Sequence, residues 1–143
     1  MLWSSVNKYL EGHPSDLVEV FFLDMSVSSW RNLFGWMSDR VVFLDCQFGG
    51  LNLDELNVEL FLSGSMSYIA HVKASSGIKL SISAIDEYEA SIDVEVEDIN
   101  CEEYFRAFLD GVSEIARVIN CKKYIVCKEF KREAPFIVNG VLV

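Results

Sequence analysis

The chain has 143 residues, of which 51% are apolar and 13% aromatic, and it carries a formal net charge of −10. This length and apolar content are typical of a folded domain and exclude a disordered or solvating acidic tail. The charge argues against nucleic-acid binding, which needs clustered Lys and Arg, and favours a basic protein partner. We therefore expect residues 1–143 to form a single domain.

Apolar periodicity and turn residues divide the first half of the chain into short elements. In chain order, we expect a helix near residues 2–10, a strand over residues 17–24, a helix that begins at Ser28 or Ser29 and ends near Ser38, a strand over residues 41–47 and a turn at Gly49-Gly50. The strand at residues 17–24 is mostly apolar, which predicts a central or helix-covered position in the sheet.

The middle of the chain predicts an antiparallel meander. Short turns containing Gly and Ser separate apolar stretches, which we expect to be strands over residues 58–63, 66–73, 78–84 and 88–97. Tyr68 and Ile82 belong to the apolar faces of these strands, whereas His71 and Ser81 belong to the opposite, polar faces. One side of the sheet is therefore expected to be partly open to solvent.

The stretch from Asp86 to Glu103 holds nine carboxylates and no Lys or Arg. Within it, Ile92, Val94 and Val96 alternate with acidic residues, which predicts a strand with one buried face and one acidic face. Acidic side chains two residues apart on a strand lie roughly 6.5 to 7 Å apart, so they repel one another. A field of a single sign is normally avoided unless it steers a partner, so this strand is a candidate binding surface.

The C-terminal third predicts one long helix followed by strands. Asn100 is expected to cap the helix, with Glu103 completing a pair that resembles a capping box, and an apolar stripe continues for five turns. Gly111 inside the helix predicts a close neighbour. Strands are expected over residues 124–128 and 136–143, the second with a turn at Asn139-Gly140. The expected fold is α+β, a mainly antiparallel sheet (a meander) with two or three helices packed on one face.

No motif predicts a catalytic residue, a metal or a cofactor. Neither His13 nor His71 has a sequence neighbour that marks a nucleophile or a zinc site, and no glycine-rich phosphate loop is present. The aromatic residues Trp30 and Trp36 could line a ligand pocket, but an aromatic stripe at helical spacing is more typical of a core. The acids around Asp93 lie on a predicted strand, where carboxylates diverge instead of converging on a metal ion.

The four cysteines contain no C-x-x-C pair. Cys101 and Cys121 would lie at opposite ends of a helix about 30 Å long, too far apart for a disulfide. The chain begins without a basic, apolar leader and contains no stretch of the length that a membrane span needs. We therefore expect a cytoplasmic protein with reduced thiols and no contact with a membrane.

Residues 78–128 resemble a known class of proteins. The acidic strand at residues 93–98, the amphipathic helix that includes residues 113–117 and the returning strand at residues 121–126 are similar to those of small cytoplasmic immunity proteins from bacterial polymorphic and contact-dependent toxin systems. The resemblance implies an inhibitor without enzymatic activity that binds a cognate toxin, often a basic nuclease, and covers its active site. It carries over no individual contact residue.

We expect the acidic strand and its ends to bind the partner. The predicted contact residues are Tyr88, Glu89, Asp93, Glu95, Glu97 and Asp98, and Tyr104 is a second apolar anchor beside Tyr88. Three alternatives stay open: a solvated face without a partner, a small ligand-binding domain or enzyme that uses the aromatic helix and His71, and a subunit of a homo-oligomer.

Overall fold

A computed structural model describes residues 1–143. The helices are α1 Trp3–Val6, α2 Val27–Ser38, α3 Val58–Leu62, α4 Val96–Ile99 and α5 Glu102–Val118, with short 3-10 helices η1 Asn7–Leu10 and η2 Leu53–Glu55. The strands are β1 Leu17–Phe22, β2 Val41–Cys46, β3 Gly49–Leu51, β4 Tyr68–Lys73, β5 Lys79–Asp86, β6 Glu89–Glu95, β7 Tyr124–Lys128, β8 Ile137–Val138 and β9 Val141–Leu142.

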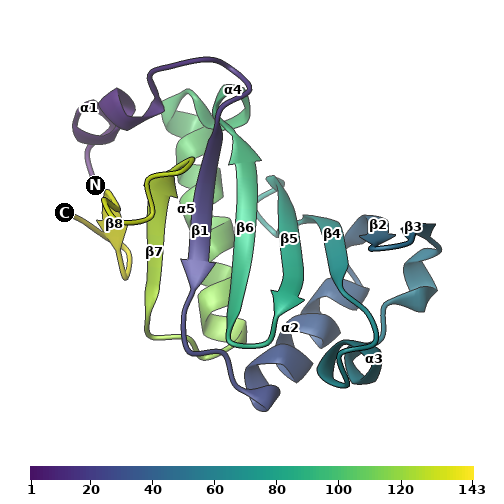
Figure 1. Cartoon of the computed structure of the whole chain (residues 1–143). Coiled ribbons are helices and arrows are strands. Elements are labelled where there is room, and N and C mark those ends of the chain that lie inside the picture. Colours follow the sequence, from purple (N-terminus) through teal and green to yellow (C-terminus); the bar gives the residue numbers. More distant parts are fainter.

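All nine strands form one antiparallel sheet in the order β3-β2-β4-β5-β6-β1-β7-β8-β9 (Figure 1). Strands β4, β5 and β6 make the predicted meander, and β1 inserts between β6 and β7. Its alternate residues Val18, Val20 and Phe22 are fully buried, which confirms the predicted central position of this strand.

Helices α2 and α5 lie against one face of the sheet, behind it in Figure 1. They enclose a single cluster of 35 buried residues with the inward side chains of the strands. Gly111 of α5 has the predicted close neighbour, since a Cβ atom there would lie 3.0 Å from Ile78 and 3.3 Å from Ala74. The absence of a side chain lets the helix approach the turn between β4 and β5. The α+β fold with helices on one face is confirmed.

The opposite face of the sheet, toward the viewer in Figure 1, carries no helix. Along β4, β5 and β6, every second side chain points to this side and is exposed or half-buried. We call it the open face. The alternation predicted for Ile92, which is fully buried, and Asp93, which is not, is confirmed.

Two predictions between residues 49 and 63 are wrong. Residues 58–63, expected to be a strand, contain helix α3, which begins where the Asn57 side chain accepts hydrogen bonds from the backbone N–H groups of Glu59 and Leu60. Phe61 then packs with Trp30 at a ring-centroid distance of 4.4 Å. Gly49-Gly50, expected to be a turn, begins strand β3, which pairs with β2 and ends the sheet.

The end of the acidic strand also differs from the prediction. Strand β6 ends at Glu95 because the next two backbone N–H groups, of Val96 and Glu97, donate to the carbonyls of Asp16 and Pro14 instead of to a sheet neighbour. The chain then forms the helical turn α4. Asn100 is not the cap of α5: the cap lies one residue later, at Cys101, whose sulfur accepts the hydrogen bond from the Tyr104 N–H. The cap of α2 lies earlier than predicted, at Ser26.

Candidate functional site

The antiparallel register places polar side chains in one row across the open face. Asp93 on β6 lies opposite Glu19 on β1 and opposite Ser81 on β5, and Ser81 lies opposite His71 on β4. The row continues to Phe43 on β2 and, on the other side, from Glu19 to Cys127 on β7. Six neighbouring strands therefore bring together residues that are far apart in the sequence.

Asp93 is the least compensated carboxylate of this row. Its Oδ1 atom is buried and has no hydrogen-bond partner. Burial and, to a smaller extent, the negative charges of Glu19 and Glu129 together raise the pKa of Asp93 to about 6. The site therefore holds three acidic side chains from three segments without a basic side chain to neutralise Asp93.

The other half of the row is polar but differently organised. The Ser81 hydroxyl and His71 Nδ1 lie 2.8 Å apart, and the Phe43 ring lies 5.5 Å from the His71 ring, centre to centre. Ser81 separates His71 from Asp93, so the imidazole does not lie between a hydroxyl and a carboxylate as it does in a hydrolytic triad. A bulge in β2 turns both Val42 and Phe43 outward, which places exposed apolar side chains beside His71.

A surface hollow of about 360 Å³ opens beside Asp93. Its acidic wall is formed by Asp93, Glu95 and Asp98, and its apolar wall includes Leu17 and Val42. This combination suits a cationic side chain with a long apolar stem, because carboxylates bind the charged end while aliphatic groups contact the methylenes.

Glu97 and Asp98 follow directly, exposed on helix α4. Hydrogen bonding with Glu97 raises the pKa of the Glu95 carboxyl, and partial desolvation and the charges of Glu97 and Asp98 raise it as well. Asp93, Glu95, Glu97 and Asp98 therefore form a continuous acidic group at one end of the sheet.

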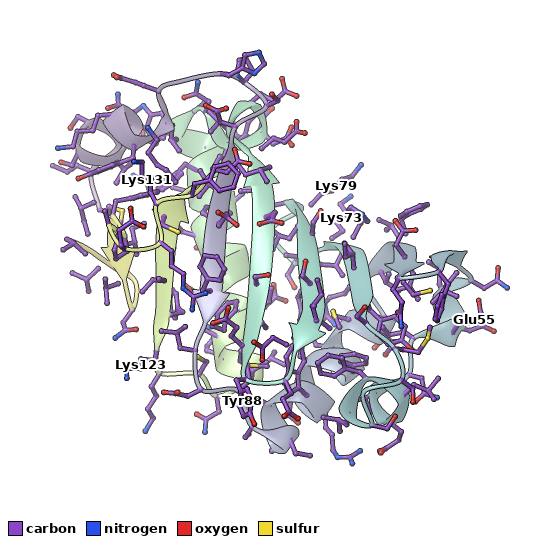
Figure 2. The ribbon with its side chains drawn as sticks, viewed as in Figure 1. Glu55, Lys73, Lys79, Tyr88, Lys123 and Lys131 are labelled. Carbon is purple, nitrogen blue, oxygen red and sulfur yellow. The ribbon has the colours of Figure 1, made fainter.

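Tyr88 and Glu89 lie at the opposite end of β6. The strand separates Glu89 from Glu95 by about 20 Å at the usual rise per residue, and Figure 2 shows Tyr88 far from Lys73 and Lys79. Arg132 donates two hydrogen bonds to Glu89, one of 2.7 Å, and its guanidinium lies 4.3 Å from the centre of the Phe21 ring. Glu89 is thus engaged within the chain, and the structure does not bring it or Tyr88 to the acidic group.

No known protein family and no curated protein matches the chain. The fold is similar to a chain of the 1.75 Å crystal structure of the toxic C-terminal tip of CdiA from Pseudomonas aeruginosa in complex with its immune protein. The TM-score is 0.61 at 15% sequence identity, and the match covers 90% of this chain and 97% of that chain. At this identity the similarity establishes a common fold.

The aromatic residues of α2 are core residues. Trp30 is 1% exposed and donates from Nε1 to the Glu87 carbonyl, and Trp36 is 7% exposed. Neither lines any of the five main surface hollows. The pocket that a ligand-binding function of this helix would need is therefore not found at Trp30 or Trp36.

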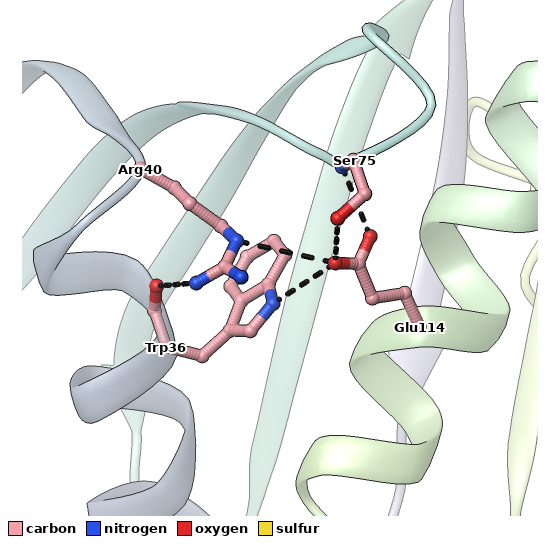
Figure 3. Close-up of polar contacts among 4 residues, drawn as sticks. All are labelled: Trp36, Arg40, Ser75 and Glu114. Carbon is pink, nitrogen blue, oxygen red and sulfur yellow. Dashed lines mark hydrogen bonds and ion pairs between the residues drawn. The ribbon is translucent and has the colours of Figure 1, made fainter.

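Trp36 takes part in a polar network that joins α2, α5 and the turn between β4 and β5 (Figure 3). Glu114 accepts hydrogen bonds from Trp36 Nε1 at 3.3 Å and from the Ser75 hydroxyl at 2.5 Å and N–H at 3.1 Å, and Arg40 lies 3.9 Å away. Burial alone would raise the pKa of Glu114, but these hydrogen bonds and the Arg40 charge outweigh it and lower the pKa. The network ties the helices to the sheet.

The structure contains no group of three or more His, Cys, Asp or Glu side chains arranged to hold a metal ion. No helix has the length and apolar character to cross a membrane. Glu19 and Glu129 were not predicted from the sequence to be neighbours of Asp93. The alternation of Glu19 with the buried residues Val18 and Val20 does indicate that its side chain lies on the outward face of the sheet, which it shares with Asp93.

Proposed function

We propose that this chain is an immunity protein, which binds a toxin domain of a bacterial contact-dependent or polymorphic toxin system and blocks its active site without chemistry of its own. The observation that carries the proposal is the set of unneutralised carboxylates around Asp93 on a sheet face that no helix covers. An uncompensated, partly buried charge costs stability, so its retention is better explained by a partner than by solubility.

Two further features support a docking role for the open face. The acidic group of Asp93, Glu95, Glu97 and Asp98 provides acceptors for Arg and Lys and a field that accelerates association with a basic surface. Phe43, which is 52% exposed, and the neighbouring Val42 provide apolar contact area beside it. Apolar anchors next to charged acceptors are typical of protein interfaces.

The common fold with a chain of a toxin–immune protein complex supports the proposal, and the net charge of −10 favours the inhibitor over a basic nuclease. We propose that the protein acts in the cytoplasm, where an inhibitor would meet an imported toxin. The proposed contact set keeps Asp93, Glu95, Glu97 and Asp98 at its centre, with Tyr88 and Glu89 at its far end.

The test is co-expression in a bacterial host with the C-terminal toxin domains encoded by the same genome, scored by recovery of growth. We expect the wild-type chain to restore growth against one of these toxins and to co-purify with it. Growth arrest on expression of this chain alone would contradict the proposal, because the chain would then be the toxic member. Failure to restore growth against every such toxin would also contradict it.

A further inference from the structure

A second hollow, of about 410 Å³, adjoins the one beside Asp93. Its lining includes Glu97, Glu103 and Tyr104, and it has Lys79 and Asp98 in common with the first hollow. The two hollows therefore meet at Lys79 and Asp98, where the open face reaches the N-terminal end of α5.

The charges along these hollows are strongly unbalanced. Lys79 is the single lysine or arginine that lines them. Five acidic side chains line them: Asp93, Glu95, Glu97, Asp98 and Glu103. None of the five acids forms a salt bridge, although five other acidic residues of the chain do. The walls thus offer several carboxylates without a salt bridge, one after another along the two hollows, instead of one isolated site.

The apolar parts of the walls define the kind of ligand further. Leu17 and Val42 line the first hollow, and Ile78 and the ring of Tyr104, which is 54% exposed, line the second. Aliphatic walls suit the stems of Arg and Lys, and an exposed tyrosine ring can stack with a guanidinium. Such a surface fits successive basic side chains of an extended segment.

We propose that the two hollows form one groove that binds an extended, arginine- or lysine-rich segment of the partner, and that Lys79 competes with this segment for the carboxylates. The proposal rests on the proposed function and defines the partner's contact chemistry. It also adds Glu103 and Tyr104 of α5 to the proposed contact residues, so that the contact surface continues from the acidic strand onto this helix.

Lys79 allows a matched comparison with Lys73. The two residues face each other on β5 and β4, both are exposed, and Figure 2 shows them at the same end of the sheet. Lys79 lines both hollows, whereas Lys73 lines neither. Replacing either lysine by Gln removes one positive charge. A difference in peptide affinity between the two variants is therefore due to the position of the lysine and not to net charge.

The probe is a fluorescein-labelled hexa-arginine peptide, whose affinity is measured by fluorescence anisotropy at low and moderate salt. A labelled hexa-glutamate peptide is the negative control. We expect Lys79→Gln to tighten binding about three- to tenfold and Lys73→Gln to change it less than about twofold, because only Lys79 contacts the groove. Tyr104→Ala and Glu103→Gln should each weaken binding. The largest changes in amide chemical shift on adding the peptide should occur at residues 79, 95–98 and 103–104.

Equal effects of the two lysine substitutions, or no effect of both Tyr104→Ala and Glu103→Gln, would overturn the groove. The outcome is separable from that of the growth assay. If the toxin is neutralised but Lys79→Gln and Tyr104→Ala leave its affinity unchanged, the groove is wrong and the inhibitor function stands. If the peptide binds as expected but no toxin is neutralised, the inhibitor function is wrong and the groove stands.

Discussion

Glu19 and Asp93 lie directly opposite each other on the adjacent strands β1 and β6, with both carboxylates on the open face of the sheet. Directly opposed like charges destabilise a pair of strands. The chain supplies no basic side chain between them, and Glu129 adds a third acidic side chain nearby. This repulsion lowers the stability of the fold at the surface that we assign to partner binding.

Removing the charge at Asp93 should stabilise the protein. We expect Asp93→Asn to raise the free energy of unfolding by about 1 to 2 kcal/mol at pH 8, less than full burial would give because water still reaches part of the side chain. The pKa of Asp93 is about 6 in the folded protein and close to 3.9 in an unfolded chain. The folded state therefore binds more protons between these values, and the advantage of Asn should shrink below pH 6 and vanish below about pH 4.

Urea unfolding of both proteins from pH 4 to pH 8 measures this difference. Asp45→Asn is the control, because Asp45 lies on the same face on β2, three positions from β6 in the sheet order. A pH-independent difference, or a loss of stability in Asp93→Asn at pH 8, would show that Asp93 is compensated in a way that the structure does not contain.

Glu114 should behave in the opposite way. Its pKa is lowered by Ser75, Trp36 and Arg40 despite burial, so the ionised side chain contributes stability above its unfolded pKa and loses it as the pH falls through the folded pKa. We expect Glu114→Gln to destabilise the protein by about 1 to 2 kcal/mol at pH 7, and the difference should shrink as the pH falls below about 4.3, the ordinary pKa of Glu. Thermal unfolding across this pH range tests it, with Asp110→Asn on the exposed side of α5 as the control. A variant as stable as wild type at pH 7 would mean that the network in Figure 3 contributes nothing.

Arg132 should protect Cys127 from thiol reagents. Cys127 is fully buried, and burial together with the Glu19 charge raises its pKa to about 11, so the thiol is unreactive at neutral pH. Arg132 holds its loop across β1 through Glu89 and Phe21. We expect Arg132→Ala to speed iodoacetamide labelling of Cys127 on the order of tenfold by increasing local opening, read by peptide mass spectrometry. Lys131→Ala in the same loop should leave the rate unchanged, and equal rates for both variants would contradict this role.

Much of the fold follows from apolar periodicity. The alternation in residues 66–95 and the long stripe of α5 are strong enough to predict the meander and its covering helix, and both are present. The failures are short segments. Val58–Leu62 is too short for periodicity to distinguish a helix from a strand, and the Asn57 cap and the packing of Phe61 on Trp30 decide its conformation.

The candidate site could be predicted in part for a related reason. Alternation along one strand places Asp93 and Glu95 on the face opposite Ile92, but it contains no information about which strands lie beside them. The insertion of β1 between β6 and β7 is a long-range pairing, and it alone brings Glu19 to Asp93. The helical turn at Glu97 and Asp98 likewise depends on hydrogen bonds to residues 14 and 16.

The central claim is that the acidic group around β6 and α4 binds a basic toxin domain, and association kinetics test it most directly. The measurement is the association rate with the toxin domain that the growth assay identifies, over a range of salt concentrations, for Glu95→Lys/Glu97→Lys and for the control Asp39→Lys/Asp110→Lys. The two variants change the net charge equally, but the control residues lie at the end of α2 and on α5. We expect a wild-type rate that falls as salt rises, a decrease of about tenfold or more for the first variant at low salt, and less than about threefold for the control. Equal slowing of both variants, or no slowing of either, would contradict the claim.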